Sequence, residues 1–215
     1  PPPAPTPHPL WSRGLGDVYK RQLAGAHVIA AIVNDGRGSG PDGMDDAMLV
    51  SERENEARNA GKIIGFSDHA FARIPDRSQH SWGQGRAWLR SLLDAHQPEF
   101  VYAPSPIDEH ADHVFTVRLL AAELEANAGS VREVSCYEVW TPLVPNRVVD
   151  ISSVAEQKRR AIQSYPTQTA RSNIEGALMG LGAFRAHRHL GASTTCAEAF
   201  WTTDPQAFVR VSHEV

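Results

Sequence analysis

Two histidines and several carboxylates fall within one short stretch of the chain, residues 105–113. His110 and His113 are three residues apart, so on a helix they share one face. That face continues with apolar residues, beginning with Val114 and Val117, which predicts that both imidazoles lie at the buried start of an amphipathic helix. A helix N-terminus disfavours imidazolium, and neutral imidazole is the form that binds a metal. The spacing predicts a metal-binding or catalytic site, although capping or surface histidines would give the same nine residues.

The surrounding patterns predict the elements that must position these side chains. A short apolar run leads directly into the histidine stretch, and sites in open α/β sheets gather at the carboxyl ends of strands. Alternation of strands and helices predicts an α/β fold, a three-layer sandwich with a mostly parallel, Rossmann-like sheet and helices on both faces. Strands are expected at residues 27–33, 62–66, 99–103, 131–140 and 147–151, with an edge strand within 196–211. Helices are expected at residues 51–61, 82–96, 111–127, 153–165 and 172–188.

Capping signals set the start of two of these helices. Ser51 with Glu54, and Ser153 with Glu156, have the spacing of a capping box. Gly61 predicts the end of the first helix, because glycine adopts the left-handed conformation that follows a last helical turn.

Composition limits the classes of function. The 215 residues are 41% hydrophobic, enough for one sizeable core. A net charge of −4, from 21 basic and 25 acidic side chains, argues against a nucleic-acid partner. The apolar runs are shorter than the roughly 20 residues of a membrane span, and the proline-rich start lacks the apolar segment of a secretory signal. The separation of Cys136 and Cys196 fits neither a CxxC pair nor a disulfide framework, which predicts free thiols in a reducing cytoplasm. Nothing indicates an oligomeric state.

Several short motifs, in order along the chain, resemble those of the LmbE-like (PIG-L) family of zinc-dependent N-acetylglucosaminyl deacetylases. The most specific is His110-Ala-Asp-His113, which matches the family's His-x-Asp-His motif. The resemblance extends over roughly residues 27–211. The other motifs are Asn34-Asp-Gly36, Arg53 with Glu56 and Ala57, Tyr165-Pro-Thr-Gln168, and Ala197-Glu-Ala-Phe200.

The resemblance implies an amidohydrolase that acts on a linear amide. Its reaction would remove an N-acetyl group from a small molecule or glycoconjugate that contains N-acetylglucosamine, using one Zn²⁺ per chain. By the same resemblance, His8 and His113 would bind the metal. His110 would stabilise the oxyanion or protonate the leaving amine, Asp112 would orient an imidazole, and Arg53 would contact the substrate.

Simpler interpretations remain open for the residues outside the histidine motif. Arg53 could equally form an i,i+3 ion pair with Glu56 on a solvated helix face. Turn chemistry is the favoured interpretation of Asp35, and packing of a helix end that of Tyr165 and Gln168.

The chain departs from the family at the N-terminal metal motif, His-Pro-Asp-Asp-Glu, whose His and second Asp bind the metal and whose first Asp is the base. Here His8 is followed by Pro9, and Leu10 and Trp11 stand where the two aspartates belong. Residues 10–22 show no convincing period and resemble translated adapter sequence. We therefore interpret residues 1–22 as an aberrant or disordered segment, an artefact of sequence assembly, and residues 23–215 as a single LmbE-like deacetylase domain.

Two other accounts of this departure stay open. The chain could be a genuine, catalytically inactive member that binds a sugar or a partner protein, or a deletion could have moved the carboxylates, with Asp17 as a poor candidate. With the motif as written, we expect weak zinc binding and little deacetylation.

A metal-dependent phosphoester hydrolase of unrelated fold is a third hypothesis for the function. The glycine run of residues 36–40 does not support it, because no lysine and helix follow in phosphate-loop spacing; this run is predicted to be a flexible rim over a pocket.

Overall fold

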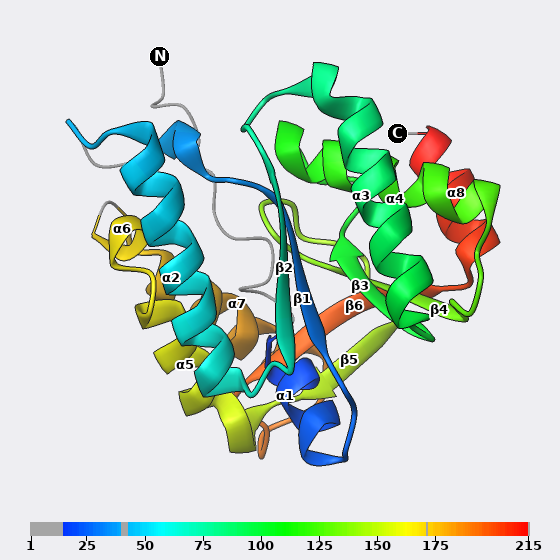
Figure 1. Ribbon diagram of the computed structural model, residues 1–215. Coiled ribbons are helices and arrows are strands. Elements are labelled where there is room, and N and C mark those ends of the chain that lie inside the picture. The colour runs from blue at the N-terminus through cyan, green and yellow to red at the C-terminus, as the bar shows by residue number, and fades with distance from the viewer. Residues whose placement is uncertain (1–14, 40–42, 171, 215) are drawn as a thin grey trace. The chain divides into compact units, whose positions relative to one another are not determined.

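The computed structural model describes residues 15–39, 43–170 and 172–214 (Figure 1). The described helices are α1 (Leu15–Leu23), α2 (Asp46–Ile64), α3 (Trp82–His96), α4 (Ala111–Ala126), α5 (Ala155–Gln163), α6 (Pro166–Thr169), α7 (Ile174–His189) and α8 (Pro205–Glu214). The described strands are β1 (Ile29–Asn34), β2 (Asp68–Ile74), β3 (Phe100–Pro104), β4 (Glu133–Tyr137), β5 (Arg147–Asp150) and β6 (Ala197–Thr203). The predicted α/β class is confirmed. His8, Leu10 and Trp11 lie outside the described residues.

The strands form two sheets, and the chain divides into two compact units. Unit 1 comprises residues 1–76 and 148–198, and unit 2 comprises residues 77–147 and 199–215. The strand orders are β1-β2 and β3-β4-β6-β5, and the second sheet is mixed because β3 and β4 are parallel while β4 and β6 are antiparallel. A single, mostly parallel sandwich is therefore not confirmed. The single domain over residues 23–215 stays a prediction.

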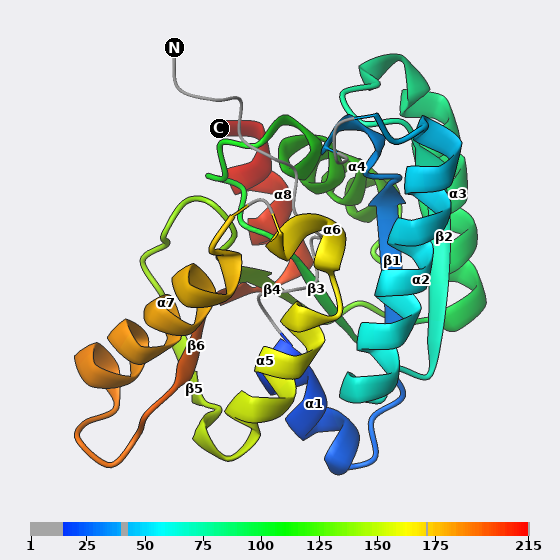
Figure 2. The same ribbon diagram turned by 90° about the vertical axis from the view of Figure 1, so that its left-hand side faces the viewer.

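Unit 1 is built around the parallel pair β1 and β2, along which α2 runs (Figures 1 and 2). The predicted capping box is wrong, because Ser51 lies inside α2. The cap is Asp45, whose side chain accepts hydrogen bonds from the N–H groups of Ala47 and Met48. The helix ends at Ile64 and is capped by Gly65, which has a φ of 84° and lies one turn beyond Gly61. The strand expected at residues 62–66 is therefore displaced to β2.

Unit 2 contains β3, β4 and most of β6, with α3, α4 and α8 packed together. The boundaries of α3 agree with those predicted. Pro98, which lies two residues beyond the helix, was the signal for its end. The C-terminal part of the chain differs from the prediction. Strand β6 lies between β4 and β5 rather than at an edge, and α8 follows it. Phe200 of β6 and Phe208 of α8 are fully buried, so both elements contribute side chains to the hydrophobic core.

Residues 15–23 form a helix, α1, although the sequence of residues 10–22 shows no convincing periodic spacing of apolar residues. Its side chains Asp17 and Val18 are buried, and the N–H groups of Gly16 and Asp17 donate to the Glu198 carboxylate at 3.0 and 2.9 Å. The interpretation of residues 1–22 as an aberrant or disordered segment stays a prediction, and residues 15–22 of that segment belong to α1. Whether their sequence is an assembly artefact stays a prediction.

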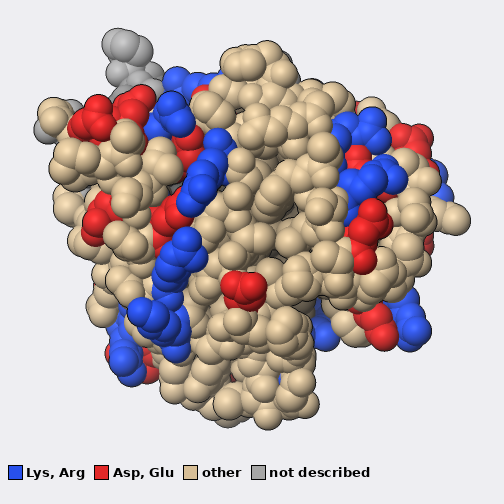
Figure 3. Space-filling model, in the orientation of Figure 1, with Lys and Arg blue, Asp and Glu red and all other residues tan. Residues whose placement is uncertain are grey.

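Charged side chains of both signs are interspersed on the face shown in Figure 3. In unit 1, Arg58 and Arg73 both pair with Glu54, at 3.2 and 2.5 Å. Among the described residues, the helices include none that is long and apolar enough to cross a bilayer.

Candidate active site

Four side chains at the start of α4 form a buried group that we call the histidine cluster: Asp108, His110, Asp112 and His113. They are between 1% and 7% exposed. The turn after β3 places them there, because the N–H of Asp108 donates to the carbonyl of Ser105 at 3.1 Å. His110 then becomes the N-cap of α4, with an extended backbone. The sequence prediction that both imidazoles lie side by side at a buried helix start is confirmed.

His113 is held by the carboxylate of Asp108. Its Nδ1 lies 2.8 Å from Asp108 Oδ1, which also accepts from the His110 N–H at 3.0 Å. The other oxygen, Oδ2, accepts from the N–H of Trp140 at 2.8 Å. A carboxylate partner assigns the proton of neutral His113 to Nδ1 and leaves the lone pair on Nε2, which is the usual arrangement of a metal-binding histidine.

The Asp108 carboxylate stays ionised despite its burial. Burial alone would raise its pKa, but the hydrogen bond and charge of His113, with the N–H groups of His110 and Trp140, lower the pKa below its ordinary value. This residue was not assigned a role from the sequence. Its position four residues after the end of β3 and five residues before His113 was the available signal.

His110 has the opposite tautomer. Its Nδ1 accepts from the N–H of Asp112 at 3.3 Å, so the proton of the neutral ring lies on Nε2. The ring centroids of His110 and His113 are 4.6 Å apart. Burial lowers the pKa of His110, and a protonated His113 would lower it further, so the neutral ring of His110 is favoured. The cluster therefore pairs one imidazole that can accept a cation with one that can donate a hydrogen bond to a developing negative charge.

Asp112 touches His110 mainly through its backbone. Its Oδ1 accepts from the N–H of Arg77 at 2.7 Å, and its Oδ2 lies 3.8 Å from His110 Nδ1. Within the cluster, the carboxylate that orients His113 is Asp108 rather than Asp112.

Arg53 lies in unit 1 and is buried, with 8% exposed. The i,i+3 ion pair with Glu56 is present at 3.6 Å, but it is buried rather than solvated. Glu56 in turn accepts from the N–H and the hydroxyl of Thr167, both at 2.8 Å. Burial raises the pKa of Glu56, and the hydrogen bonds from Thr167 oppose that shift. Tyr165 and Gln168 are buried at the start of α6, in agreement with the packing interpretation.

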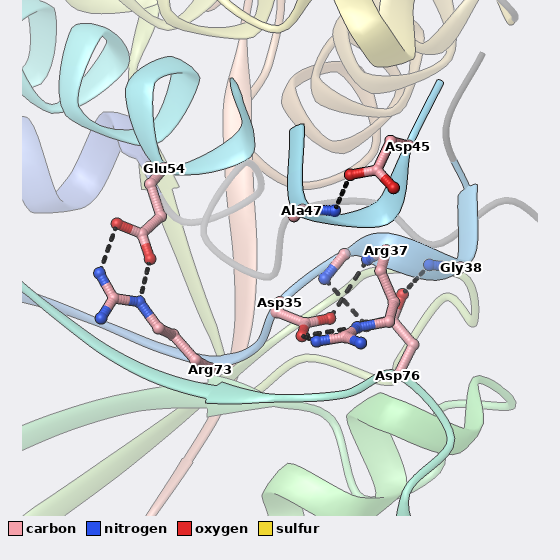
Figure 4. Close-up of polar contacts among 9 residues, drawn as sticks. Asp35, Arg37, Gly38, Asp45, Ala47, Glu54, Arg73 and Asp76 are labelled. Carbon is pink, nitrogen blue, oxygen red and sulfur yellow. Dashed lines mark hydrogen bonds and ion pairs between the residues drawn. The ribbon is translucent and has the colours of Figure 1, made fainter. Parts of the chain in front are cut away.

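Turn chemistry accounts for Asp35. Its carboxylate accepts from the N–H of Arg37 at 3.2 Å and from the guanidinium of the same residue (Figure 4). Gly36 has a φ of 76°, and a Cβ there would lie 3.3 Å from Arg53 Cγ. Glycine is thus required both by the backbone and by the close approach of the Arg53 side chain.

One described side chain has the hydrogen-bond arrangement of a metal-binding histidine. His113 fits a divalent cation, because Asp108 holds its Nδ1 and leaves Nε2 as a donor. Over residues 15–39, 43–170 and 172–214, however, no group of three or more His, Cys, Asp or Glu side chains could hold a metal. The other ligand implied by the family is His8, outside this range, and the side chains of Leu10 and Trp11 carry no metal-binding donor suited to zinc.

Comparison with known proteins gives one family and a set of solved structures. The family described as PIG-L, GlcNAc-PI de-N-acetylase, matches residues 12–123. The N,N'-diacetylchitobiose deacetylase of Pyrococcus horikoshii shares 20% identity with a TM-score of 0.77, over 92% of this chain and 80% of that one. GalB, the 4-carboxy-2-hydroxymuconate hydratase of Pseudomonas putida, shares 20% identity with a TM-score of 0.73, over 89% and 90%. A deacetylase of teicoplanin biosynthesis shares 18% identity with a TM-score of 0.68, over 90% and 94%. At these identities the structures show a shared fold, and GalB shows that this fold also carries a different reaction.

Proposed function

Because the chain belongs to the PIG-L family, we propose that it has the framework of a zinc-dependent deacetylase, impaired at its N-terminal metal motif. The substrate would be a small amino sugar or glycoconjugate that contains an N-acetylglucosamine unit, and the bond broken would be its linear amide. The buried free thiols of Cys136 and Cys196 support the cytoplasmic location that we propose with it.

The observation that carries this proposal is the pair of opposite hydrogen-bond arrangements of the two imidazoles: Nδ1 of His113 faces the Asp108 carboxylate, and Nδ1 of His110 faces the N–H of Asp112. His113, whose Nδ1 is bonded to Asp108, would hold the metal through Nε2, and His8 would be the second imidazole ligand. Bound zinc supplies an activated water and polarises the acyl carbonyl. His110 is then the donor for the negative charge that develops on the carbonyl oxygen, because its Nε2 carries the proton.

The remaining residues act on these groups or on the substrate. Asp112 positions His110 through its backbone N–H. Arg53 is the proposed contact to the sugar, held in a fixed orientation by Glu56 and by the glycine turn at Gly36. Two components are missing, the general base and the carboxylate ligand of the metal, since Leu10 and Trp11 occupy their places in the motif.

Acetate release tests the proposal. The chain as it stands and the double variant Leu10→Asp/Trp11→Asp are each incubated with an N-acetylglucosaminide and Zn²⁺. We expect little acetate from the former and release at enzyme-like rates from the latter, abolished again by His110→Ala. A restored variant that stays inactive would contradict the deacetylase assignment.

One observation favours a second function. If Leu10 and Trp11 are the genuine residues, the N-terminal motif supplies no base, and the same framework would serve to bind a sugar or a partner protein. Resequencing of the source DNA over residues 8–22 separates the two, because aspartates after His8 support the enzyme and Leu10-Trp11 supports the binding protein.

A further inference from the structure

The chain passes from β2 to α3 through two residues that are each held within their own unit. In unit 1, the Asp76 carboxylate accepts from the N–H of Gly36 at 3.0 Å and from that of Gly38 at 2.9 Å. Figure 4 shows this carboxylate facing Gly38, beside the Asp35–Arg37 pair. In unit 2, the N–H of Arg77 donates to Asp112 Oδ1 at 2.7 Å. The link is thus fixed at both of its residues.

This link is held in a strained conformation. Arg77 has a φ of 59° and Arg73 a φ of 53°, in the left-handed region that residues other than glycine seldom adopt. Arg73 lies where the register of β1 and β2 shifts, so β2 carries a bulge there, and its guanidinium is fixed by Glu54 (Figure 4). Strain of this kind persists only where the surroundings impose it, and it is concentrated at functional sites.

The strained link leads to the histidine cluster. Arg77 directs its N–H to the Asp112 carboxylate, and the N–H of Asp112 in turn donates to His110 Nδ1. The second of these bonds sets the tautomer of His110. A change in the backbone of Arg77 would remove this hydrogen bond from the Asp112 carboxylate, whose Oδ2 lies 3.8 Å from His110 Nδ1. A closer approach of that carboxylate to Nδ1 would favour a proton there.

We propose that Asp76 and Arg77 are positioning residues that keep the proton of neutral His110 on Nε2. The catalytic importance of this proton rests on the proposed function, whereas its placement does not. The conformation of Arg77, rather than its charge, does the positioning, because only its backbone N–H bonds to Asp112.

Two substitutions of Arg77 separate conformation from charge. Arg77→Gly and Arg77→Val both remove the guanidinium and both keep the N–H group. Glycine adopts a φ near 60° freely, whereas a β-branched valine resists it. Asp76→Ala removes the acceptor of Gly36 and Gly38. Its matched control is Asp45→Ala, since Asp45 also accepts from two backbone N–H groups, at 2.9 and 3.3 Å, at the start of α2.

The readout is the ring ¹⁵N spectrum of histidine-labelled chain above neutral pH, with the His110 signals assigned from their loss in His110→Gln. The spectrum reports which ring nitrogen carries the proton and requires no activity. We expect the Nε2–H form in the unchanged chain, in Arg77→Gly and in Asp45→Ala. Arg77→Val and Asp76→Ala should lose it in favour of a mixture of the two tautomers.

Equal behaviour of Arg77→Gly and Arg77→Val would overturn the role of Arg77, whether both keep the Nε2–H form or both lose it. An unchanged spectrum in Asp76→Ala would overturn the role of Asp76. If a variant fails to give a folded amide spectrum, the milder Asp76→Asn, which puts an NH₂ group against one of the two N–H donors, must show the same mixture or the proposal fails. Failure of Leu10→Asp/Trp11→Asp to release acetate would refute the proposed function and leave this tautomer result unaffected.

Discussion

Substitution of Asp108 by asparagine perturbs the histidine cluster at its most connected residue. The carboxylate accepts from His113 Nδ1 and the His110 N–H through one oxygen, and from the Trp140 N–H through the other, all within 3.0 Å. Asparagine keeps one of these acceptors and turns the other into a donor. Whichever way the amide is oriented, at least one buried donor loses its partner.

The size of the effect follows from these bonds. A hydrogen bond to a charged group contributes about 1.5–3 kcal/mol, and an unsatisfied buried donor costs about 1–3 kcal/mol. Because the two figures describe in part the same lost hydrogen bond, they do not add in full, and we expect Asp108→Asn to lower the free energy of unfolding by about 2–4 kcal/mol. With a urea m-value of about 1–3 kcal/mol/M, the unfolding midpoint falls by on the order of 1–2 M.

Tryptophan fluorescence during urea unfolding is the assay, because the described tryptophans (Trp82, Trp88, Trp140 and Trp201) all lie in unit 2 with Asp108. The control is Asp94→Asn, the same chemical change at an exposed position of α3. Surface substitutions change stability by roughly 0.5 kcal/mol or less. A midpoint for Asp108→Asn equal to that of the control would refute the assignment of Asp108 as the anchor of the cluster.

Two further predictions concern unit 1. The hydrogen bond from Arg73, with the charges of Arg73 and Arg58, holds the pKa of Glu54 below its ordinary value against the effect of burial. The ionised Glu54 therefore stabilises the fold at pH values above the pKa that it has in the unfolded chain. This stabilisation is lost as the pH falls through the pKa of the folded state. Arg73→Gln should raise the pKa of Glu54 in an NMR titration, and an unshifted value would contradict the ion pair. Thr167→Val removes the hydroxyl that donates to buried Glu56, and we expect the pKa of Glu56 to rise further. The amide hydrogens of α2 should exchange faster, which corresponds to a fall of about 1–2 kcal/mol in the free energy of opening. The control Thr169→Val, which loses only a bond to a helix carbonyl, should leave that pKa unchanged.

Local patterns predicted the elements whose limits are set by neighbouring residues. The boundaries of α3 and the start of α4 were predicted because apolar periodicity and a nearby proline or turn agree there. The capping box at Ser51 misled because its Glu54 pairs with Arg73, nineteen residues away, instead of capping the helix. Spacing in the sequence cannot distinguish these two uses of one carboxylate.

The histidine cluster was predicted in part for the same reason. His110 and His113 are neighbours on one helix turn, so their spacing indicates their proximity. Asp108 depends on the N–H of Trp140, which is 32 residues away, and only the folded chain brings these two together. The link at Asp76 and Arg77 rests on a positive φ in an arginine, which residue type alone does not indicate.

Zinc content tests the central claim most directly. The claim is that His113, held by Asp108, is a ligand of an otherwise disrupted metal site. Leu10→Asp/Trp11→Asp is equilibrated with Zn²⁺, desalted and analysed for bound metal, beside the unchanged chain and the same double variant carrying His113→Gln. We predict about one zinc per chain in the double variant and little in the other two. Retention of zinc after His113→Gln, or equal zinc in the unchanged chain and the double variant, would contradict the account.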